Sequence, residues 1–158
     1  MKCKLLIRFV SLLSIFCILL SSTAFASETS NDPPKYFTYT IYSNDGQVKE
    51  YGMFPNSYYP QPKVSYGPVT LGSGETVAFN CAQVYAYKDT KMNLSYRLNR
   101  SAAHRYTWSV GSVALPSYTG TSNGRDTWAL APVNGNVCMS FNNRSSDPFT
   151  ISYVTLSW

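Results

Sequence analysis

The chain has 158 residues, a formal net charge of +5, one histidine and four cysteines. This length is enough for a domain with a real hydrophobic core. One histidine and scattered single acids argue against a zinc site, so the sequence assigns no catalytic residue, no metal and no cofactor.

The first 26 residues have the pattern of a secretory signal peptide. Lys2, Lys4 and Arg8 precede an uncharged, mainly apolar run over 9–20, and the segment ends in the small-residue pattern of Ala24 and Ala26. The run is shorter than the roughly 20 residues that span a bilayer as a helix. We expect cleavage after Ala26 and a secreted, extracellular protein.

Removing the signal peptide changes both charge and cysteine content. The mature chain would have 158 − 26 = 132 residues and 13 − 3 = 10 basic against 8 acidic residues, a net charge of +2. This weak charge argues against a nucleic-acid partner. Cys81 and Cys138 remain, and in an oxidising compartment they predict one disulfide, with two separate buried thiols as the alternative.

Residues 27–34 are polar, end in two prolines and predict a flexible leader. After them, short runs rich in Tyr, Thr, Val and Phe alternate with Gly, Asn, Asp and Pro, which is typical of β-strands and turns. Asp45-Gly46 predicts a tight hairpin, and residues 52–62, with three prolines, predict a loop. The expected strands cover 36–42, 47–51, 64–71, 75–85, 92–99, 105–110, 113–118, 126–131, 137–142 and 149–158.

Eight to ten strands at this spacing predict a single all-β domain over 35–158. An antiparallel β-sandwich of jelly-roll type is the favoured fold class, and a closed barrel is the alternative. In the strand 92–99, Met92, Leu94, Tyr96 and Leu98 alternate with polar residues, which indicates one buried and one solvent-facing side.

Enzymatic chemistry would have to use His104, which stands at the expected start of a strand. Histidine titrates near neutral pH and could act as a general base in a small hydrolase or nuclease. A surface or structural role is the more common one for a single histidine, so the sequence favours a non-enzymatic protein.

The residues that favour binding are aromatic and basic. The mature chain would carry 21 aromatic side chains, more than one sandwich of this size is expected to bury, and exposed rings suit sugars, peptides or membrane interfaces. Tyr58 and Tyr59 in the loop 52–62, and Trp128, are the candidate aromatic contacts. The alternative is that tyrosine is simply a favoured strand residue.

The segment 88–105 holds five basic residues and one acid. We expect strands 92–99 and 105–110 to form a hairpin in which Arg97 and Arg105 share a face, with Arg100 near the turn. Such a patch would attract an anionic polymer such as teichoic acid, or acidic lipid headgroups at a membrane surface. A charged edge strand that blocks aggregation is the alternative.

The runs 39–46, 98–102 and 139–158 resemble small uncharacterised secreted proteins of bacilli and related Gram-positive bacteria. The resemblance implies an extracellular β domain and transfers no activity or site residue. The sequence therefore favours a secreted module that binds a cell-surface or extracellular glycan or polyanion. A secreted antibacterial or membrane-active effector is the second hypothesis, and a hydrolase using His104 is the third.

Overall fold

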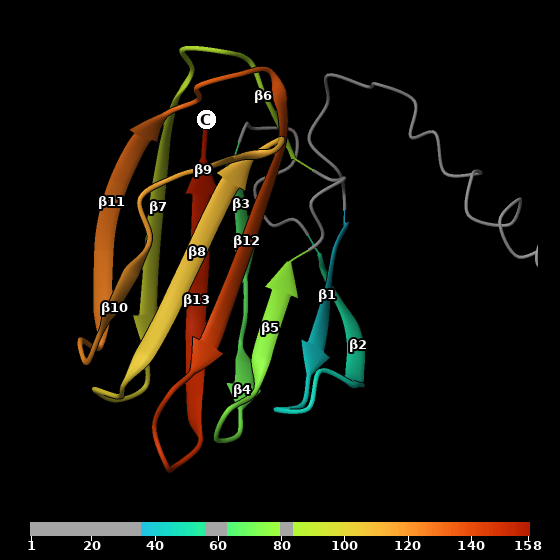
Figure 1. Ribbon diagram of the computed structural model, residues 1–158, viewed down its shortest axis with the longest axis vertical. Helices are drawn as coiled ribbons and strands as arrows, with labels where there is room; N and C mark the ends of the chain where they lie inside the picture. Colours follow the sequence, from blue (N-terminus) through green and yellow to red (C-terminus); the bar gives the residue numbers. More distant parts are fainter. Residues whose placement is uncertain (1–35, 56–62, 80–83) are drawn as a thin grey trace, which may run out of the picture. The chain divides into compact units, whose positions relative to one another are not determined.

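The computed structural model describes residues 36–55, 63–79 and 84–158 (Figure 1). All of them belong to one compact unit, Asn31–Trp158. The predicted signal peptide and leader lie outside the described residues, as do Tyr58, Tyr59 and Cys81.

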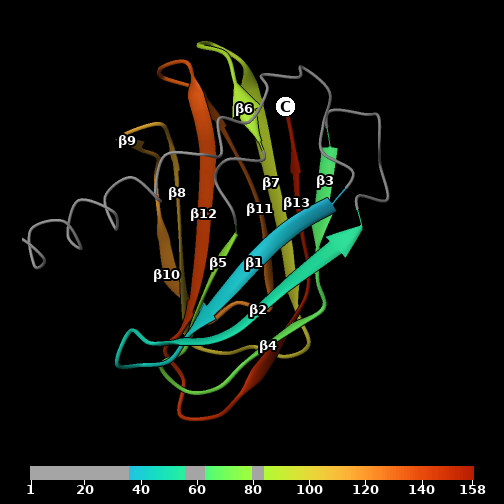
Figure 2. The same cartoon turned by 90° about the vertical axis from the view of Figure 1, so that its right-hand side faces the viewer.

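The first of two sheets, sheet A, has eight strands in the described part of the chain. Its hydrogen-bonded order is β10 (Tyr118–Gly120), β8 (His104–Val110), β12 (Gly135–Asn143), β5 (Thr76–Phe79), β1 (Tyr36–Tyr42) and β2 (Val48–Pro55), with β6 (Tyr85–Ala86) on β12 and β9 (Val113–Ala114) on β8. Strands β1 and β2 run obliquely to the long strands, as Figure 2 shows.

The second sheet, sheet B, has five strands within the same described ranges. Its order is β11 (Gly124–Leu130), β7 (Lys91–Leu98), β13 (Phe149–Ser157) and β3 (Lys63–Tyr66), with β4 (Val69–Leu71) also on β13. Strand β13 is central because it pairs with β7 on one side and with β3 and then β4 on the other.

Alternating side chains from both sheets form one core between the layers. Strand β7 buries Met92, Leu94, Tyr96 and Leu98, as the sequence pattern predicted, and Phe141 of β12 lies fully buried on the facing sheet. Every pairing between the described strands is antiparallel. The predicted two-sheet sandwich is therefore confirmed, and the barrel alternative is wrong.

Several predicted boundaries differ from the structure. The expected strand 64–71 is divided into β3 and β4 around Gly67-Pro68, because proline lacks the N–H that a continuous ladder requires. The expected loop 52–62 is wrong at its start, since β2 continues to Pro55 as an edge strand.

Candidate functional site: the outer face of sheet B

The side of sheet B that faces away from the core is a regular array of exposed residues. The buried alternation of β7 turns Lys91, Asn93, Ser95 and Arg97 outward, where an antiparallel neighbour presents its own outward side chains beside them. On β11, Leu130 lies opposite Lys91, Trp128 opposite Asn93, Asp126 opposite Ser95 and Gly124 opposite Arg97.

The array continues across β13 on the other side of β7. Tyr153 pairs directly with Arg97, Thr155 with Ser95 and Ser157 with Asn93. We call these outward residues of β11, β7 and β13 the outer face of sheet B. Its middle consists of hydroxyl, amide and carboxylate groups, and its two aromatic side chains stand at opposite corners.

Trp128 is the most prominent aromatic side chain of this face, with 62% of its surface exposed. The Nζ atom of Lys91 lies 5.3 Å from the centroid of the indole ring, within the range of a cation–π contact. Asn93 is its direct cross-strand neighbour and Asp126 stands two residues away on its own strand. An apolar ring thus lies beside hydrogen-bonding groups on a rigid sheet.

Arg97 and Tyr153 form the other corner. The side chain of Arg97 lies close over Gly124, whose missing Cβ leaves this space: a Cβ there would come within 3.2 Å of Cδ of Arg97. In the part of the chain that the structure describes, the ion pairs are Lys49–Glu75 and Arg100–Asp147, so Arg97 has no carboxylate partner there. Tyr153 keeps 37% of its surface exposed beside this cation.

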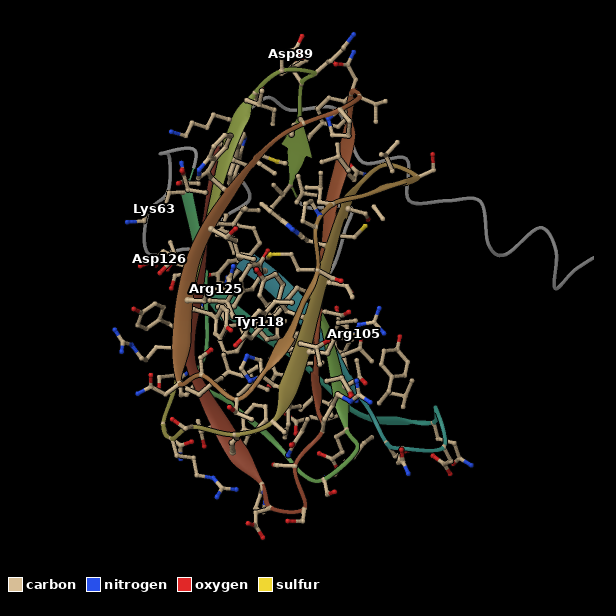
Figure 3. The ribbon with its side chains drawn as sticks, turned by 60° about the vertical axis from the view of Figure 1, so that its left-hand side comes forward. Lys63, Asp89, Arg105, Tyr118, Arg125 and Asp126 are labelled. Atoms are coloured by element: carbon tan, nitrogen blue, oxygen red, sulfur yellow. The ribbon has the colours of Figure 1, made fainter. Side chains whose placement is uncertain are left out.

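The three arginines of the predicted basic patch do not share one face. Strands β7 and β8 belong to different sheets, so the expected hairpin between 92–99 and 105–110 is wrong. Arg105 points outward from sheet A, opposite Asn142 of β12. Figure 3 shows Arg105 on the other side of the sandwich from Asp126 and Lys63.

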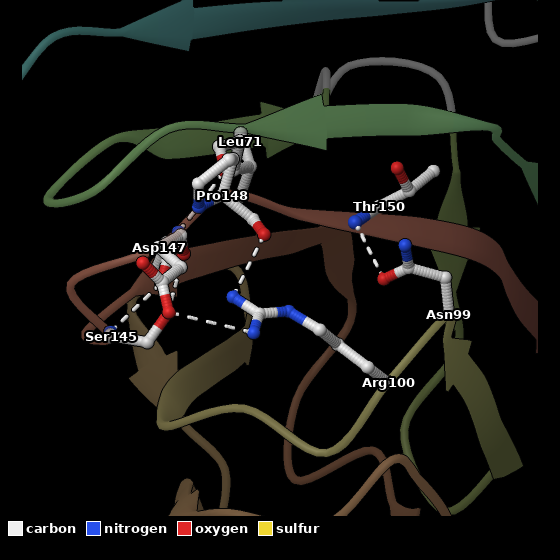
Figure 4. A network of polar contacts seen from close by, with 8 residues as sticks. Leu71, Asn99, Arg100, Ser145, Asp147, Pro148 and Thr150 are labelled. Atoms are coloured by element: carbon white, nitrogen blue, oxygen red, sulfur yellow. Dashed lines mark hydrogen bonds and ion pairs between the residues drawn. The ribbon is translucent and has the colours of Figure 1, made fainter.

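Arg100 takes part in a network that joins two turns. Its Nη2 donates to the carbonyl of Pro148 at 2.9 Å, and its Nη1 lies 3.6 Å from a carboxylate oxygen of Asp147 (Figure 4). Beside it, Asn99 accepts a hydrogen bond from the backbone N–H of Thr150. The guanidinium of Arg100 therefore bonds to the neighbouring turn at 147–148.

His104 is completely buried, with none of its surface exposed. Its Nδ1 donates to the carbonyl of Ala102 at 2.8 Å, since a carbonyl can only accept, and its Nε2 accepts from the hydroxyl of Tyr96 at 2.7 Å. Burial lowers the pKa of His104, against a smaller opposing effect of the Ala102 carbonyl. Both nitrogens are occupied, which disfavours a general base acting on an external substrate.

The remaining sequence-based candidates lie elsewhere. Tyr58 and Tyr59 lie outside the described residues, and so does Cys81, so its disulfide with Cys138 of β12 stays a prediction. The structure instead adds Asn93, Asp126 and Tyr153 to Trp128. The period-two pattern of strand 92–99 was the available signal for Asn93, but nothing in the sequence placed β11 and β13 on either side of it.

A second group of exposed side chains lies on the outward face of β1 and β2. Tyr51 has 63% of its surface exposed, and Met53 and Val48 are exposed beside it. Tyr51 is thus as exposed as Trp128 but lies on the opposite sheet, next to Thr40. It provides a matched control for the outer face of sheet B.

The described ranges contain no group of three or more His, Cys, Asp or Glu side chains placed to hold a metal ion. They also contain no helix with the length and apolarity needed to cross a membrane.

No family model matches the chain, and no curated protein matches it. Among solved structures, the unliganded CBM1 of BiXyn10A is 14% identical over 77% of this chain and 81% of its own, with a TM-score of 0.38. The CBM22-1–GH10 xylanase 10B of Clostridium thermocellum, complexed with xylohexaose, is 11% identical over 80% of this chain and 26% of its own, with a TM-score of 0.41. The C-terminal CBM6 of LamC from Zobellia galactanivorans is 12% identical over 76% and 99%, with a TM-score of 0.35. Likeness at this level assigns no ligand or site residue to this chain.

Proposed function

We propose that this protein is a secreted, non-enzymatic module that binds a cell-surface or extracellular glycan on the outer face of sheet B. The observation that carries the proposal is the setting of Trp128, an indole with 62% of its surface exposed on a rigid sheet, with Asn93 and Asp126 beside it. An exposed aromatic ring next to hydrogen-bonding groups suits a sugar, which has apolar C–H faces and polar hydroxyl edges.

The sheet holds these groups in place before a ligand arrives. Strand β7, which carries Asn93, buries Met92, Leu94 and Tyr96 in the core. The strand therefore cannot turn its outward residues away from this face. Cross-strand pairing fixes Trp128 against Asn93 and Asp126 against Ser95. A site preorganised in this way loses little conformational entropy on binding.

A pulldown on purified cell walls and polysaccharides at physiological salt tests the proposal. We expect retention of the wild type and a loss of about tenfold or more for Trp128→Ala, because a few large aromatic contacts supply most of the binding energy of a site. Tyr51→Ala removes an equally exposed ring from the other sheet and should bind like the wild type.

Absence of retention on every polysaccharide, or equal retention of Trp128→Ala, would contradict the proposal. A liposome-leakage assay runs beside the pulldown. Leakage without wall or polysaccharide binding would favour the membrane-active effector instead.

A further inference from the structure

The two exposed aromatic side chains of the outer face of sheet B each stand beside a cation. Lys91 lies 5.3 Å from the ring centroid of Trp128, and Arg97 is the direct cross-strand neighbour of Tyr153. We call Trp128–Lys91 and Tyr153–Arg97 the two aromatic–cation pairs. Each pair could stack on a sugar ring and attract an acidic substituent of the same or the next sugar.

The register sets the separation between the pairs. Asn93, opposite Trp128, and Arg97, opposite Tyr153, are four residues apart on β7, about 13 Å along the strand. Strands β11 and β13 lie on opposite sides of β7, about 10 Å apart. The aromatic residues are therefore roughly 16 Å apart on the diagonal, too far for one sugar ring and suitable for a chain of several.

The residues between the pairs are polar and include one acid. Ser95 and Thr155 lie on the connecting row, together with Asp126. An acidic group of the ligand placed over Asp126 would meet a like charge, whereas a hydroxyl would find an acceptor. This distribution of charge suits a ligand whose acidic groups are spaced along the chain and separated by neutral sugars.

We propose that the two aromatic–cation pairs bind one linear acidic polysaccharide that crosses sheet B diagonally over β7. This inference rests on the proposed glycan-binding function. It adds the charge class of the ligand, the two subsites that bind it and its diagonal path over the sheet. The acidic groups are carboxylates or phosphates, both of which pair with Lys91 and Arg97 in the same manner.

The test uses hyaluronan fragments, in which acidic and neutral sugars alternate, with their methyl esters as the uncharged match. Teichoic acid is the phosphate-bearing arm. Binding is measured by calorimetry with the full mature protein at several salt concentrations. We expect an octasaccharide to bind at least tenfold more tightly than a disaccharide, because only the longer chain can reach both pairs.

Substitutions that remove one charge should separate the attraction of acidic groups from the stacking of sugar rings on the aromatic side chains. Lys91→Gln and Arg97→Gln should each lower the affinity for acidic ligands about two- to fivefold and make its salt dependence shallower. The affinity for the methyl esters should not change. Asp126→Asn should raise the affinity for the acidic ligand, because it removes a like charge from the site. Arg105→Gln removes a cation from the opposite sheet and is the matched control, expected to behave like the wild type.

The outcomes distinguish this inference from the function on which it rests. Equal, salt-independent binding of acid and methyl ester that is lost in Trp128→Ala would overturn the acidic class and leave the glycan face standing. Equal binding of short and long acidic chains would overturn the single diagonal ligand. Binding of neither acidic probe, while neutral glycans bind, would also reject the charge class. If no glycan binds at all, both this inference and the proposed glycan-binding function are wrong.

Discussion

The hydroxyl of Tyr96 lies 2.7 Å from Nε2 of His104, inside the sandwich and without contact with solvent at the ring. Burial favours the neutral imidazole, and because its one hydrogen is on Nδ1, which donates to Ala102, Nε2 accepts from Tyr96. Protonation would place a hydrogen on Nε2, remove the acceptor for Tyr96 and leave a charge in the core. The pair therefore links protein stability to pH.

The first prediction concerns that link. Burial lowers the folded-state pKa of His104 below its ordinary value of 6.5, so the unfolded chain takes up the proton first as the pH falls. The stability contributed by neutral His104 should be fully present above pH 6.5 and lost as the pH falls through the lowered folded-state pKa, with a slope of at most about 1.4 kcal/mol per pH unit. Urea unfolding at a series of pH values measures it. In His104→Gln this part of the slope should vanish, and an unchanged slope would show that His104 is not responsible.

The second prediction concerns Asn143, which is fully buried at the end of β12. Its Nδ2 donates to the carbonyls of Leu71 and Asp147, both at 3.0 Å, and its Oδ1 accepts from the N–H of Ser145 at 2.8 Å. Asn143→Ala would leave buried backbone groups without partners, so we expect a loss of about 3 kcal/mol in the free energy of unfolding. Asn136→Ala, at an exposed position of the same strand, should change it by less than about 0.5 kcal/mol. Similar losses in the two variants would argue against the Asn143 network.

The third prediction concerns the contact between the two edge strands β10 and β11. The guanidinium carbon of Arg125, an exposed residue, lies 4.7 Å from the ring centroid of the half-buried Tyr118, and Figure 3 shows the two residues close to each other. Arg125→Ala should lower the free energy of unfolding by about 1 kcal/mol through loss of this cation–π contact. Arg105→Ala, on the outward side of sheet A, is the control and should cost less than about 0.5 kcal/mol. If both cost the same, the contact adds nothing to stability.

The fourth prediction concerns Gly52 of β2, over which the ring of Tyr39 lies. That ring stacks on Phe54 with centroids 4.8 Å apart, and its hydroxyl donates to Glu50 at 2.7 Å. A Cβ at residue 52 would collide with the tyrosine ring, so Gly52→Ala should destabilise the protein by about 1–3 kcal/mol. In the Tyr39→Ala background the same substitution should cost much less, and equal costs in both backgrounds would refute the steric explanation.

The sequence pattern predicted correctly those features that depend on interactions between residues close together in the chain. The alternation in β7 identified its buried and exposed sides, and Asp45-Gly46 identified the hairpin between β1 and β2, with Gly46 at a φ of 82°. Trp128 was a candidate from its residue type alone. Its role in a face could not be derived, because that depends on Asn93 and Tyr153, which are distant in sequence and adjacent only through strand pairing.

The assumption that strands consecutive in sequence form a hairpin produced the main error. Strands β7 and β8 follow each other closely, yet β7 pairs with β11 and β13 while β8 pairs with β10, β9 and β12. The chain crosses between the layers at 99–103, so Arg97 and Arg105 face opposite sides. Charge clustering in sequence is therefore a poor guide to a charged surface in a two-layer fold.

By itself the sequence determined that the chain forms short antiparallel strands, and which side of a strand such as β7 is buried, because side-chain alternation and turn chemistry act over a few residues. The tertiary structure alone decided which strands are neighbours, and so which side chains share a surface. Strand pairing depends on the total burial that an entire arrangement achieves, and that sum cannot be read from any one segment. Trp128, Lys91, Arg97 and Tyr153 became one candidate site only through that arrangement.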